Sequence, residues 1–295
     1  MDRTREGLTF GVGAYALWGL FPLFWPLLEP ASAPEVLAHR VLWSLALMCV
    51  LLRVARGWPA LRAVEPSQVR RLAVASVLLA SNWGLYIYGV NSGQVVETSL
   101  GYFITPLVSV ALGVVVLGER LRPAQQLAIG FAVAAVAVLT VENGRPPYIA
   151  LGLALSFGTY GLLKKQANVG ALASLSIETA VTAPLAAAYL LWLALVGSGT
   201  FTGHGPDHVL LLLSSGVVTA VPLLLFGAAA TRVPLVTLGV LQYLAPTLQL
   251  LVGLSVRHEP FGPVRLVGFG LVWVALAVFS ADLLRHHRRV RVVAC

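Results

Sequence analysis

Residues 106–130 read PLVSVALGVVVLGERLRPAQQLAIG, and residues 246–270 read PTLQLLVGLSVRHEPFGPVRLVGFG. When the chain is shifted by 140 positions, nine residues of the stretch 98–141 coincide with residues of the same type. Five of these matches involve types that coincide by chance less readily than Leu and Val, namely Pro106, Gly113, Glu119, Pro123 and Gly130. Twice 140 is nearly the full length of 295 residues, so the sequence predicts a duplicated unit.

The composition indicates that lipid is the solvent for much of the chain. Hydrophobic residues make up 58% and charged residues 11%, and the mean hydropathy is +0.85. Soluble domains carry about 25% charged residues. A soluble fold of this length could not bury so much apolar surface, so we expect an all-α polytopic membrane protein. The net charge of +8 is attributed to basic cytoplasmic loops, and no nucleic-acid binding is expected.

The hydropathy pattern predicts ten transmembrane helices, each near the roughly 20 residues that cross a bilayer. The predicted spans are 8–28, 35–53, 72–90, 96–117, 123–141, 148–166, 172–196, 209–230, 234–256 and 262–284. An Asn-Gly and a Pro-Pro pair within 142–147 separate a five-helix repeat at 1–144 from another at 145–295. Because each copy has an odd number of spans, the two are expected to be inverted, as in many secondary transporters. Inversion puts the Glu119 and Glu259 turns on opposite sides of the bilayer.

Lys and Arg predict the orientation. With the N-terminus inside, the cytoplasmic segments hold 16 of these residues and the outer loops hold three. The outer three are Arg145, Arg257 and Arg265, and one more, Arg40, lies within a span. This asymmetry predicts that both termini are cytoplasmic.

The second span carries charge into the hydrocarbon region, where each charged group costs roughly 2.5–3.5 kcal/mol on insertion scales. Arg40 lies about one turn inside it. Either it clamps an anion or pairs with a carboxylate, for which Glu97 and Glu178 are candidates, or its side chain extends to the interface. His39 either carries a proton near neutral pH or hydrogen-bonds a neighbour.

Polar side chains also follow one face of the third span. Asn82, Tyr86 and Gly89 lie at helical spacing. The amide and the phenol either bind a polar substrate or make interhelical hydrogen bonds, which are worth about 0.6 kcal/mol each on average.

Spans four and nine share a polar residue one turn before a proline. Tyr102 precedes Pro106, and Gln242 precedes Pro246, with Gln249 following on the same face. A mid-helix proline frees a backbone carbonyl, which is tolerated in a membrane where it lines a cavity. The pattern predicts two helix hinges beside a mid-depth site, and the alternative is a pair of kinked packing helices.

Aromatic residues beside glycine occur in the first span of each half. Tyr15 and Trp18 precede Gly19, and Phe157 and Tyr160 precede Gly161. For Tyr15 and Trp18 we predict a place on the substrate pathway, against the alternative of packing and interfacial anchoring.

Several functions lack support. No Walker loop, His-Glu-x-x-His or Gly-x-Ser-x-Gly motif is present, and none of the three aspartates lies mid-span. We therefore expect that the protein is not driven by ATP, binds no metal and no cofactor, and is not an enzyme. A membrane enzyme acting on a lipid-linked substrate would need a nucleophile or carboxylate pair, and a non-transporting sensor would have only short loops and tails for partners.

The chain resembles the RarD group within the EamA branch of the drug/metabolite transporter superfamily. The resemblance rests on Trp18-Gly-Leu-Phe-Pro22, Glu35-Val-Leu-Ala-His-Arg40, Asn82-Trp83, Ser99-Leu-Gly-Tyr-Phe-Ile-Thr-Pro106, Gly118-Glu-Arg-Leu121, Ser156-Phe-Gly-x-Tyr-Gly161 and Leu241-Gln-Tyr-x-x-Pro-Thr247. It implies two inverted five-helix repeats in the bacterial inner membrane and a small-molecule permease that exports its substrate. Members are often named for chloramphenicol sensitivity. Thr105 departs from the family pattern, which commonly has Asn before the proline.

Taken together, these patterns predict a secondary transporter that moves a small metabolite or drug by alternating access, as a monomer or homodimer, with protons as a candidate coupling ion. The residues expected to line the substrate site are Tyr15, Trp18, His39, Arg40, Asn82, Tyr86, Tyr102, Gln242 and Gln249.

Overall fold

The computed structural model describes residues 3–117, 122–230, 232 and 241–293, and the regular structure in these ranges is helical. The helices are α1 (Arg3–Gly19), α2 (Phe21–Phe24), the 3₁₀ helix η1 (Trp25–Leu28), α3 (Ala33–Val54), α4 (Trp58–Arg62), α5 (Pro66–Asn91), α6 (Val95–Leu117), α7 (Pro123–Asn143), α8 (Tyr148–Ala167), α9 (Ala171–Leu195), α10 (Gly205–Ala230), α12 (Leu244–Ser255) and α13 (Pro263–Val293).

Local chemistry sets many helix ends. The Oγ of Ser32 accepts the Glu35 amide at the start of α3, and α5 and α7 each begin with a proline at their first position. Proline suits this position because the first amides of a helix have no intrahelical partner. Helix α7 ends at Asn143 and is followed by Gly144, which has a φ of 64°, a left-handed conformation that favours glycine.

Within the described ranges, seven helices are long and apolar enough to cross a membrane. The residues from α1 to η1, bent by 42° after Gly19, make an eighth if they form one span. The apolar parts of α8 and α12 are shorter, at Tyr148–Lys164 and Leu244–Ser255. Helices match the positions of the predicted spans, except that much of the start of the predicted span 234–256 lies outside the described residues. The count of ten spans therefore stays a prediction.

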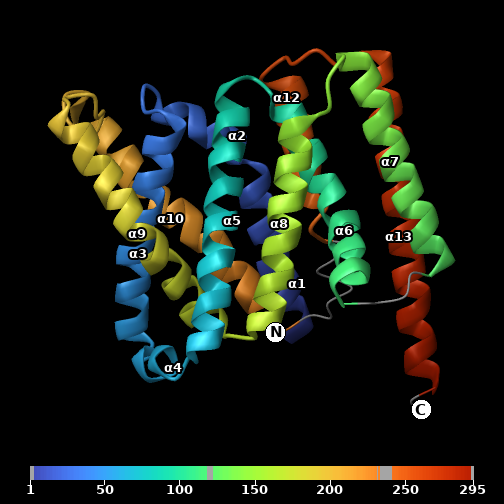
Figure 1. Cartoon of the computed structure of the whole chain (residues 1–295), viewed down its shortest axis with the longest axis horizontal. Coiled ribbons are helices and arrows are strands. Elements are labelled where there is room, and N and C mark those ends of the chain that lie inside the picture. Colours follow the sequence, from blue (N-terminus) through green and yellow to red (C-terminus); the bar gives the residue numbers. More distant parts are fainter. Residues whose placement is uncertain (1–2, 118–121, 231, 233–240, 294–295) are drawn as a thin grey trace.

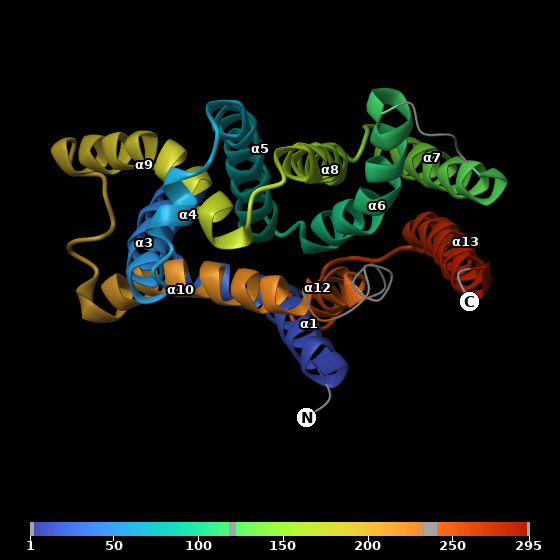
Figure 2. The same ribbon diagram turned by 90° about the horizontal axis from the view of Figure 1, so that it is seen from below.

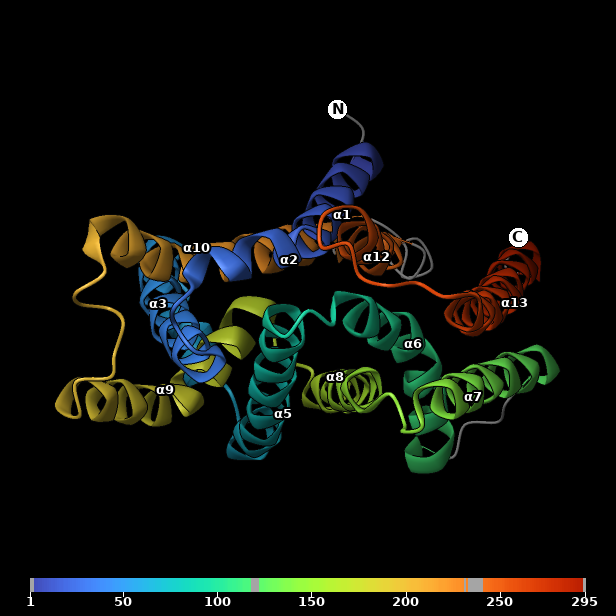
Figure 3. The same ribbon diagram turned by 90° about the horizontal axis from the view of Figure 1, so that it is seen from above.

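Figure 1 views the bundle from the side, and the turned views show that the helices form two rows (Figures 2 and 3). Seen from below, α9, α5, α8 and α7 form one row, and α10, α1, α12 and α13 form the other (Figure 2). The view from above shows the same two rows, with α3 beside α9 and α10 at one end and α6 between α8 and α12 (Figure 3). Helix α1 begins and α13 ends at the same end of the bundle, the lower one in Figure 1.

The helix pairings are reciprocal between the two predicted repeats. Helix α8 packs on α5 and α6, and its counterpart α1 packs on α10 and α12. Helix α3 packs on α10, and its counterpart α9 packs on α5. The halves meet through α3 with α9, α6 with α12, and α7 with α13.

Among the described residues, the two largest apolar clusters lie between these helices. One lies among α6, α7, α8, α12 and α13, around Phe103 and Phe269. The other includes Trp25, Tyr86 and Leu153 and lies among η1, α3, α5, α6, α8 and α10. The Trp25 ring of this second cluster lies against the guanidinium of Arg40, and so does Trp83 from a separate cluster, so the cation lies among aromatic rings.

Candidate functional site

Helix α3 carries Arg40 into the interior of the bundle. The residue lies seven positions after the start of α3, about 10 Å along its axis, and is only 3% exposed. Its Nε donates to the Thr219 Oγ1 of α10 at 2.6 Å. Its guanidinium carbon lies 3.9 Å from the ring centroid of Trp83, 4.9 Å from that of Trp25 and 5.8 Å from that of Phe21. These aromatic faces attract a cation, each by about 0.5–2 kcal/mol.

The carboxylate partners suggested for Arg40 are wrong. Glu178 is bound by the Lys164 Nζ at 2.6 Å, and the Oε1 of Glu97 accepts the Ile149 amide at 3.0 Å. In the part of the chain that the structure describes, no carboxylate pairs with Arg40. Nor does its side chain extend to the surface, because it is buried on every side. The described contacts of the cation are thus aromatic rings and one hydroxyl.

Three buried hydrogen-bond donors, one of them on Arg40 itself, donate to no described acceptor. The Arg40 Nη1, the Trp25 Nε1 and the Tyr86 hydroxyl are shielded from solvent and have no hydrogen-bond partner among the described residues. Arginine and tryptophan can only donate. Leaving a buried polar atom unpaired costs about 1–3 kcal/mol, so native structures contain few of them and each needs an explanation.

Asn82 holds three helices together. Its Nδ2 donates to the Leu153 carbonyl at 3.0 Å and to the Ser156 Oγ at 2.9 Å, both on α8. Its Oδ1 accepts the hydroxyl of Tyr102 from α6 at 3.0 Å. The Tyr102 ring in turn lies 5.6 Å from that of Tyr86. These contacts fit the alternative interpretation, in which Asn82 makes hydrogen bonds between helices. Contact of Asn82 with a substrate stays a prediction.

Tyr15 and Trp18 form an aromatic group with Phe226 of α10, with ring centroids 5.3–6.0 Å apart. The Trp18 carbonyl accepts the Nε2 of Gln249 from α12 at 3.1 Å. That carbonyl is available because α1 ends one residue later, at Gly19. The Gln249 Oε1 is buried with no partner in the described ranges, so the residue retains an unused acceptor.

His39 is held by its neighbours. Its Nδ1 accepts the indole Nε1 of Trp43 at 3.2 Å, and its ring stacks on Phe201 at 4.9 Å. The accepted bond places the proton of the neutral imidazole on Nε2. One turn earlier, the Oε1 of Glu35 accepts the amide and hydroxyl of Thr200 at 2.6 and 3.0 Å. A role for His39 in proton coupling stays a prediction.

The two predicted hinge prolines differ in position. Pro106 lies inside α6, where it leaves the Tyr102 carbonyl without its usual amide partner. Pro246 is the third residue of α12, a first-turn position at which a proline removes no intrahelical bond. Pro246 therefore lies at the start of α12 rather than in its middle, and a hinge at this residue stays a prediction. Gln242 lies in the turn before that helix and is half-buried.

Four residues that contact Arg40 were not predicted from the sequence, namely Phe21, Trp25, Trp83 and Thr219. A signal was present for the tryptophans, because the chain has only seven and Trp83 follows Asn82 directly. Residue spacing within one helix could not reveal the group, since η1, α3, α5 and α10 each contribute to it.

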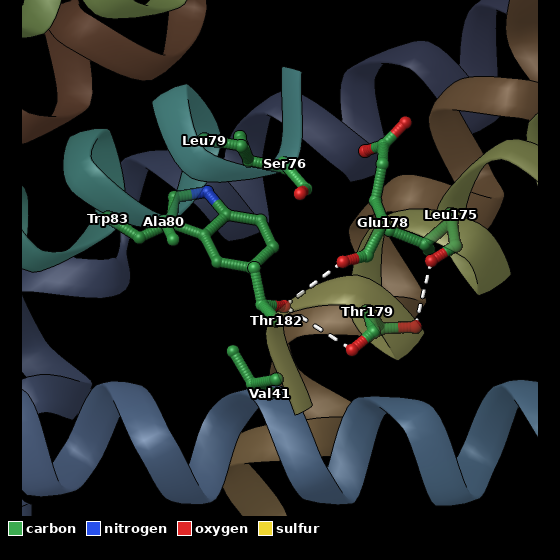
Figure 4. Close-up of a pocket in the computed structure, with 9 residues that line it drawn as sticks. All are labelled: Val41, Ser76, Leu79, Ala80, Trp83, Leu175, Glu178, Thr179 and Thr182. Carbon is green, nitrogen blue, oxygen red and sulfur yellow. Dashed lines mark hydrogen bonds between the residues drawn. The ribbon is translucent and has the colours of Figure 1, made fainter. Parts of the chain in front are cut away.

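A second buried charge lies between α8 and α9 and is fully paired. Glu178, which is 2% exposed, accepts bonds from Lys164, from the Tyr160 hydroxyl at 3.1 Å and from the Ser174 Oγ at 2.7 Å. Beside it lies a cavity of about 10 Å³, with the Trp83 indole on the opposite wall (Figure 4). The cavity has room for one water at most, so this cluster is an interhelical tie.

A larger cavity of about 140 Å³ lies where α6 begins, lined by Glu97, Arg145, Glu259 and Arg265 among others. The two Glu259 oxygens accept the amides of residues 95 and 96, at 2.6 and 2.9 Å. Burial raises the pKa of Glu259, and these two amides act in the opposite direction. The carboxylate thus joins the loop before α13 to the first turn of α6.

Relatives of known sequence match nearly the whole chain, and a family profile matches most of its N-terminal half. A profile of the EamA-like transporter family matches residues 5–141. The protein RarD of Streptomyces exfoliatus is 53% identical over 98% of this chain and 93% of its own length. The uncharacterized transporter YojE of Bacillus subtilis strain 168 is 42% identical over 97% of each chain. One crystal structure of a protein aligns with a TM-score of 0.59 over 93% of this chain and 97% of its own, at 21% identity, a likeness of fold alone.

Proposed function

Because the chain belongs to the RarD group of the EamA-like transporter family, we propose that it is a secondary active transporter that exports a small molecule across the bacterial inner membrane by alternating access. The observation that carries the proposal is Arg40. A cation buried within a membrane-spanning helix, with no described carboxylate beside it, is a functional site by default.

The reciprocal helix pairings support the inverted-repeat part of this proposal. Each of the first five predicted spans can be exchanged with its equivalent among the second five. This exchange turns each major helix–helix contact into another major contact or into itself. A pseudo-twofold axis in the membrane plane has this effect. Substrate then binds near the axis and reaches either side as one set of helices rocks against the other.

The ends of α6 and α13 support opposite orientations of the two halves. Glu259 binds the first turn of α6, whereas residue 119 follows the last turn of that helix and lies outside the described residues. Arg122, just beyond it, pairs with Asp282 at 2.8 Å. Asp282 lies 19 residues after Pro263 in α13, about 28 Å from the Glu259 loop.

In this proposal the predicted site residues line the substrate pathway, with Arg40 as its charged centre, and Pro106 allows α6 to bend. Both termini are cytoplasmic, which agrees with α1 beginning and α13 ending on one side (Figure 1). Protons are the candidate coupling ion through His39.

Flux into reconstituted vesicles tests the function. Amino acids and antibiotics are screened with and without a pH gradient, and the recovered compound is analysed for chemical change. A transporter delivers an unaltered compound to the lumen, whereas an enzyme returns a product. Flux of no compound in the wild-type protein would refute the proposal.

Two variants test the site. Arg40→Ala and Gln242→Ala should each lower the flux without loss of folded protein. Arg71→Ala is the matched control, because Arg71 is exposed and its Nη1 donates to the Gln166 carbonyl at 2.7 Å. If both site variants transport normally, the site assignment is wrong even if the fold stands.

A further inference from the structure

We propose that Arg40, Trp25 and Tyr86 together form an oxyanion-binding centre and that the transported molecule carries a carboxylate. This inference rests on the proposed function. It names the class of substrate and adds Trp25 to the binding residues. The centre is built from three elements, η1, α3 and α5. The Trp25 ring faces the Arg40 guanidinium, and Tyr86 lies on α5 about one turn after Trp83, whose ring centroid is 3.9 Å from the guanidinium carbon.

The hydrogen-bonding capacity of the centre is one-sided. Its three unused groups are an arginine Nη1, an indole Nε1 and a phenol hydroxyl, all of them donors, and the first two cannot accept. A group that satisfies them must offer several lone pairs at once. A carboxylate has two oxygens with about four acceptor sites and can accept a bidentate arginine.

Charge also favours an anion. The aromatic faces of Phe21, Trp25 and Trp83 offset part of the cost of burying the cation but do not neutralise it. Charge-assisted hydrogen bonds are about twice as strong as neutral ones, and more so where water is excluded. A neutral amide could fill the same space, but it would leave the guanidinium uncompensated.

A single cation selects a single negative charge. Apart from Arg40 itself, the side chains described around its guanidinium are aromatic rings and the hydroxyl of Thr219. A phosphate dianion would therefore bring a second charge with no partner into an apolar centre, which is costly. The surrounding rings suit a carboxylate that has an apolar or aromatic body.

The bend after Gly19 gives this centre a means of opening. Phe21 and Trp25 both belong to the short segment beyond the bend, whereas Arg40 and Tyr86 lie on the long helices α3 and α5. A shift of the short segment would move the Phe21 and Trp25 rings away from the guanidinium and leave Trp83 and Thr219 in place.

Tryptophan fluorescence measures the predicted binding directly, since two indoles lie within 5 Å of the guanidinium carbon. The full chain in lipid nanodiscs is titrated with a panel of aliphatic and aromatic monocarboxylates, including phenylacetate, and with the neutral amide of each. At least one acid should bind saturably, and its amide should bind at least tenfold more weakly. Phenyl phosphate tests whether the centre prefers a carboxylate to a phosphate, and it should bind more weakly than the best acid.

Variants separate a binding role from a folding role. Arg40→Gln should abolish the response to the acid, and Arg71→Gln should retain it. Tyr86→Phe removes a single hydroxyl from the centre and should weaken acid binding roughly tenfold, which corresponds to about 1.4 kcal/mol. Tyr88→Phe is its control, because Tyr88 is exposed on the same helix.

Several outcomes would overturn the inference. These are no binding of any acid, equal binding of acid and amide, tighter binding of phenyl phosphate, or unchanged acid binding in Arg40→Gln and Tyr86→Phe. Vesicle flux distinguishes this failure from failure of the proposed function. Transport of neutral compounds that does not depend on Arg40 would support the proposed transport function and refute the proposal that the substrate carries a carboxylate. Saturable acid binding without flux of any compound would support the oxyanion-binding centre and refute the proposed transport function.

Discussion

Replacing Gly216 with alanine tests the packing on which the Arg40 site depends. Gly216 lies in α10 against α3, where its carbonyl accepts the Ser44 Oγ at 3.5 Å. A Cβ at this position would lie 2.5 Å from the carbonyl carbon and the Cβ of Trp43 and 2.9 Å from the Ser44 nitrogen. Ordinary contact begins at 3.4 Å, and the obstructing atoms are mainly backbone, so α10 must move away from α3 by about 0.9 Å.

That displacement reaches the site because Thr219, the partner of Arg40, lies three residues further along α10. A shift of this size along their 2.6 Å bond would stretch it to about 3.5 Å, beyond a normal hydrogen bond. Overpacking of a close contact typically costs about 1–3 kcal/mol. We therefore expect Gly216→Ala to lower the free energy of unfolding by about that amount and to weaken Arg40-dependent binding.

Thermal unfolding in detergent, together with the fluorescence titration, measures both effects. Gly161→Ala in α8 is the control, since a Cβ there meets no atom within 4 Å. It should leave stability unchanged or raise it by up to about 1 kcal/mol, because alanine is the better helix former. If Gly216→Ala unfolds at the wild-type temperature and binds normally, α3 and α10 are not in this close contact and the reasoning fails.

Three further changes probe the remaining polar contacts. Asn82→Ala removes bonds to α6 and α8 and should destabilise the protein by about 2–3 kcal/mol, measured by thermal unfolding against the conservative Asn82→Gln. Lys164→Met leaves the Glu178 carboxylate without its cation and should cost about 2–4 kcal/mol, with rescue by Lys164→Arg; equal stability of the two variants would contradict the tie. Burial raises the pKa of Glu259 above its ordinary 4.5, so the folded protein holds this proton to higher pH than the unfolded chain does. Stability should fall as the pH rises from about 4.5 through the raised pKa, and Glu259→Gln should remove that fall in unfolding curves taken across the acid range.

Helix positions could be predicted from the sequence because the signals that end a helix are local. The Pro-Pro pair and the Asn-Gly step in 142–147 predicted a boundary, and α7 ends at Asn143 while α8 begins at Tyr148. Proline lacks an amide and glycine adopts positive φ, whatever the rest of the fold does. The same holds for Pro123, which begins α7.

The partners of the buried polar groups could not be predicted in this way. Glu178 was considered as a partner for Arg40 because both lie in apolar spans, yet Lys164 lies closer to it across the α8–α9 contact. Choosing between such partners requires knowing which helices are neighbours. Pro246 illustrates the same limit. Its position within the helix depends on where α12 begins, and no residue type near Leu244 marks that start.

Polar residues inside the bundle fall into two groups that the sequence alone cannot separate. Asn82 and Glu178 have their hydrogen bonds and charges met by neighbouring helices, and this is what a tie between helices requires. Arg40, Trp25 and Tyr86 have capacity left over, although they are as deeply buried. Burial is costly for both groups, so a stable fold alone gives no reason to leave the second group unsatisfied. Unused donors beside a buried charge, rather than polarity alone, therefore distinguish the proposed binding centre at Arg40 from the structural contacts of Asn82 and Glu178.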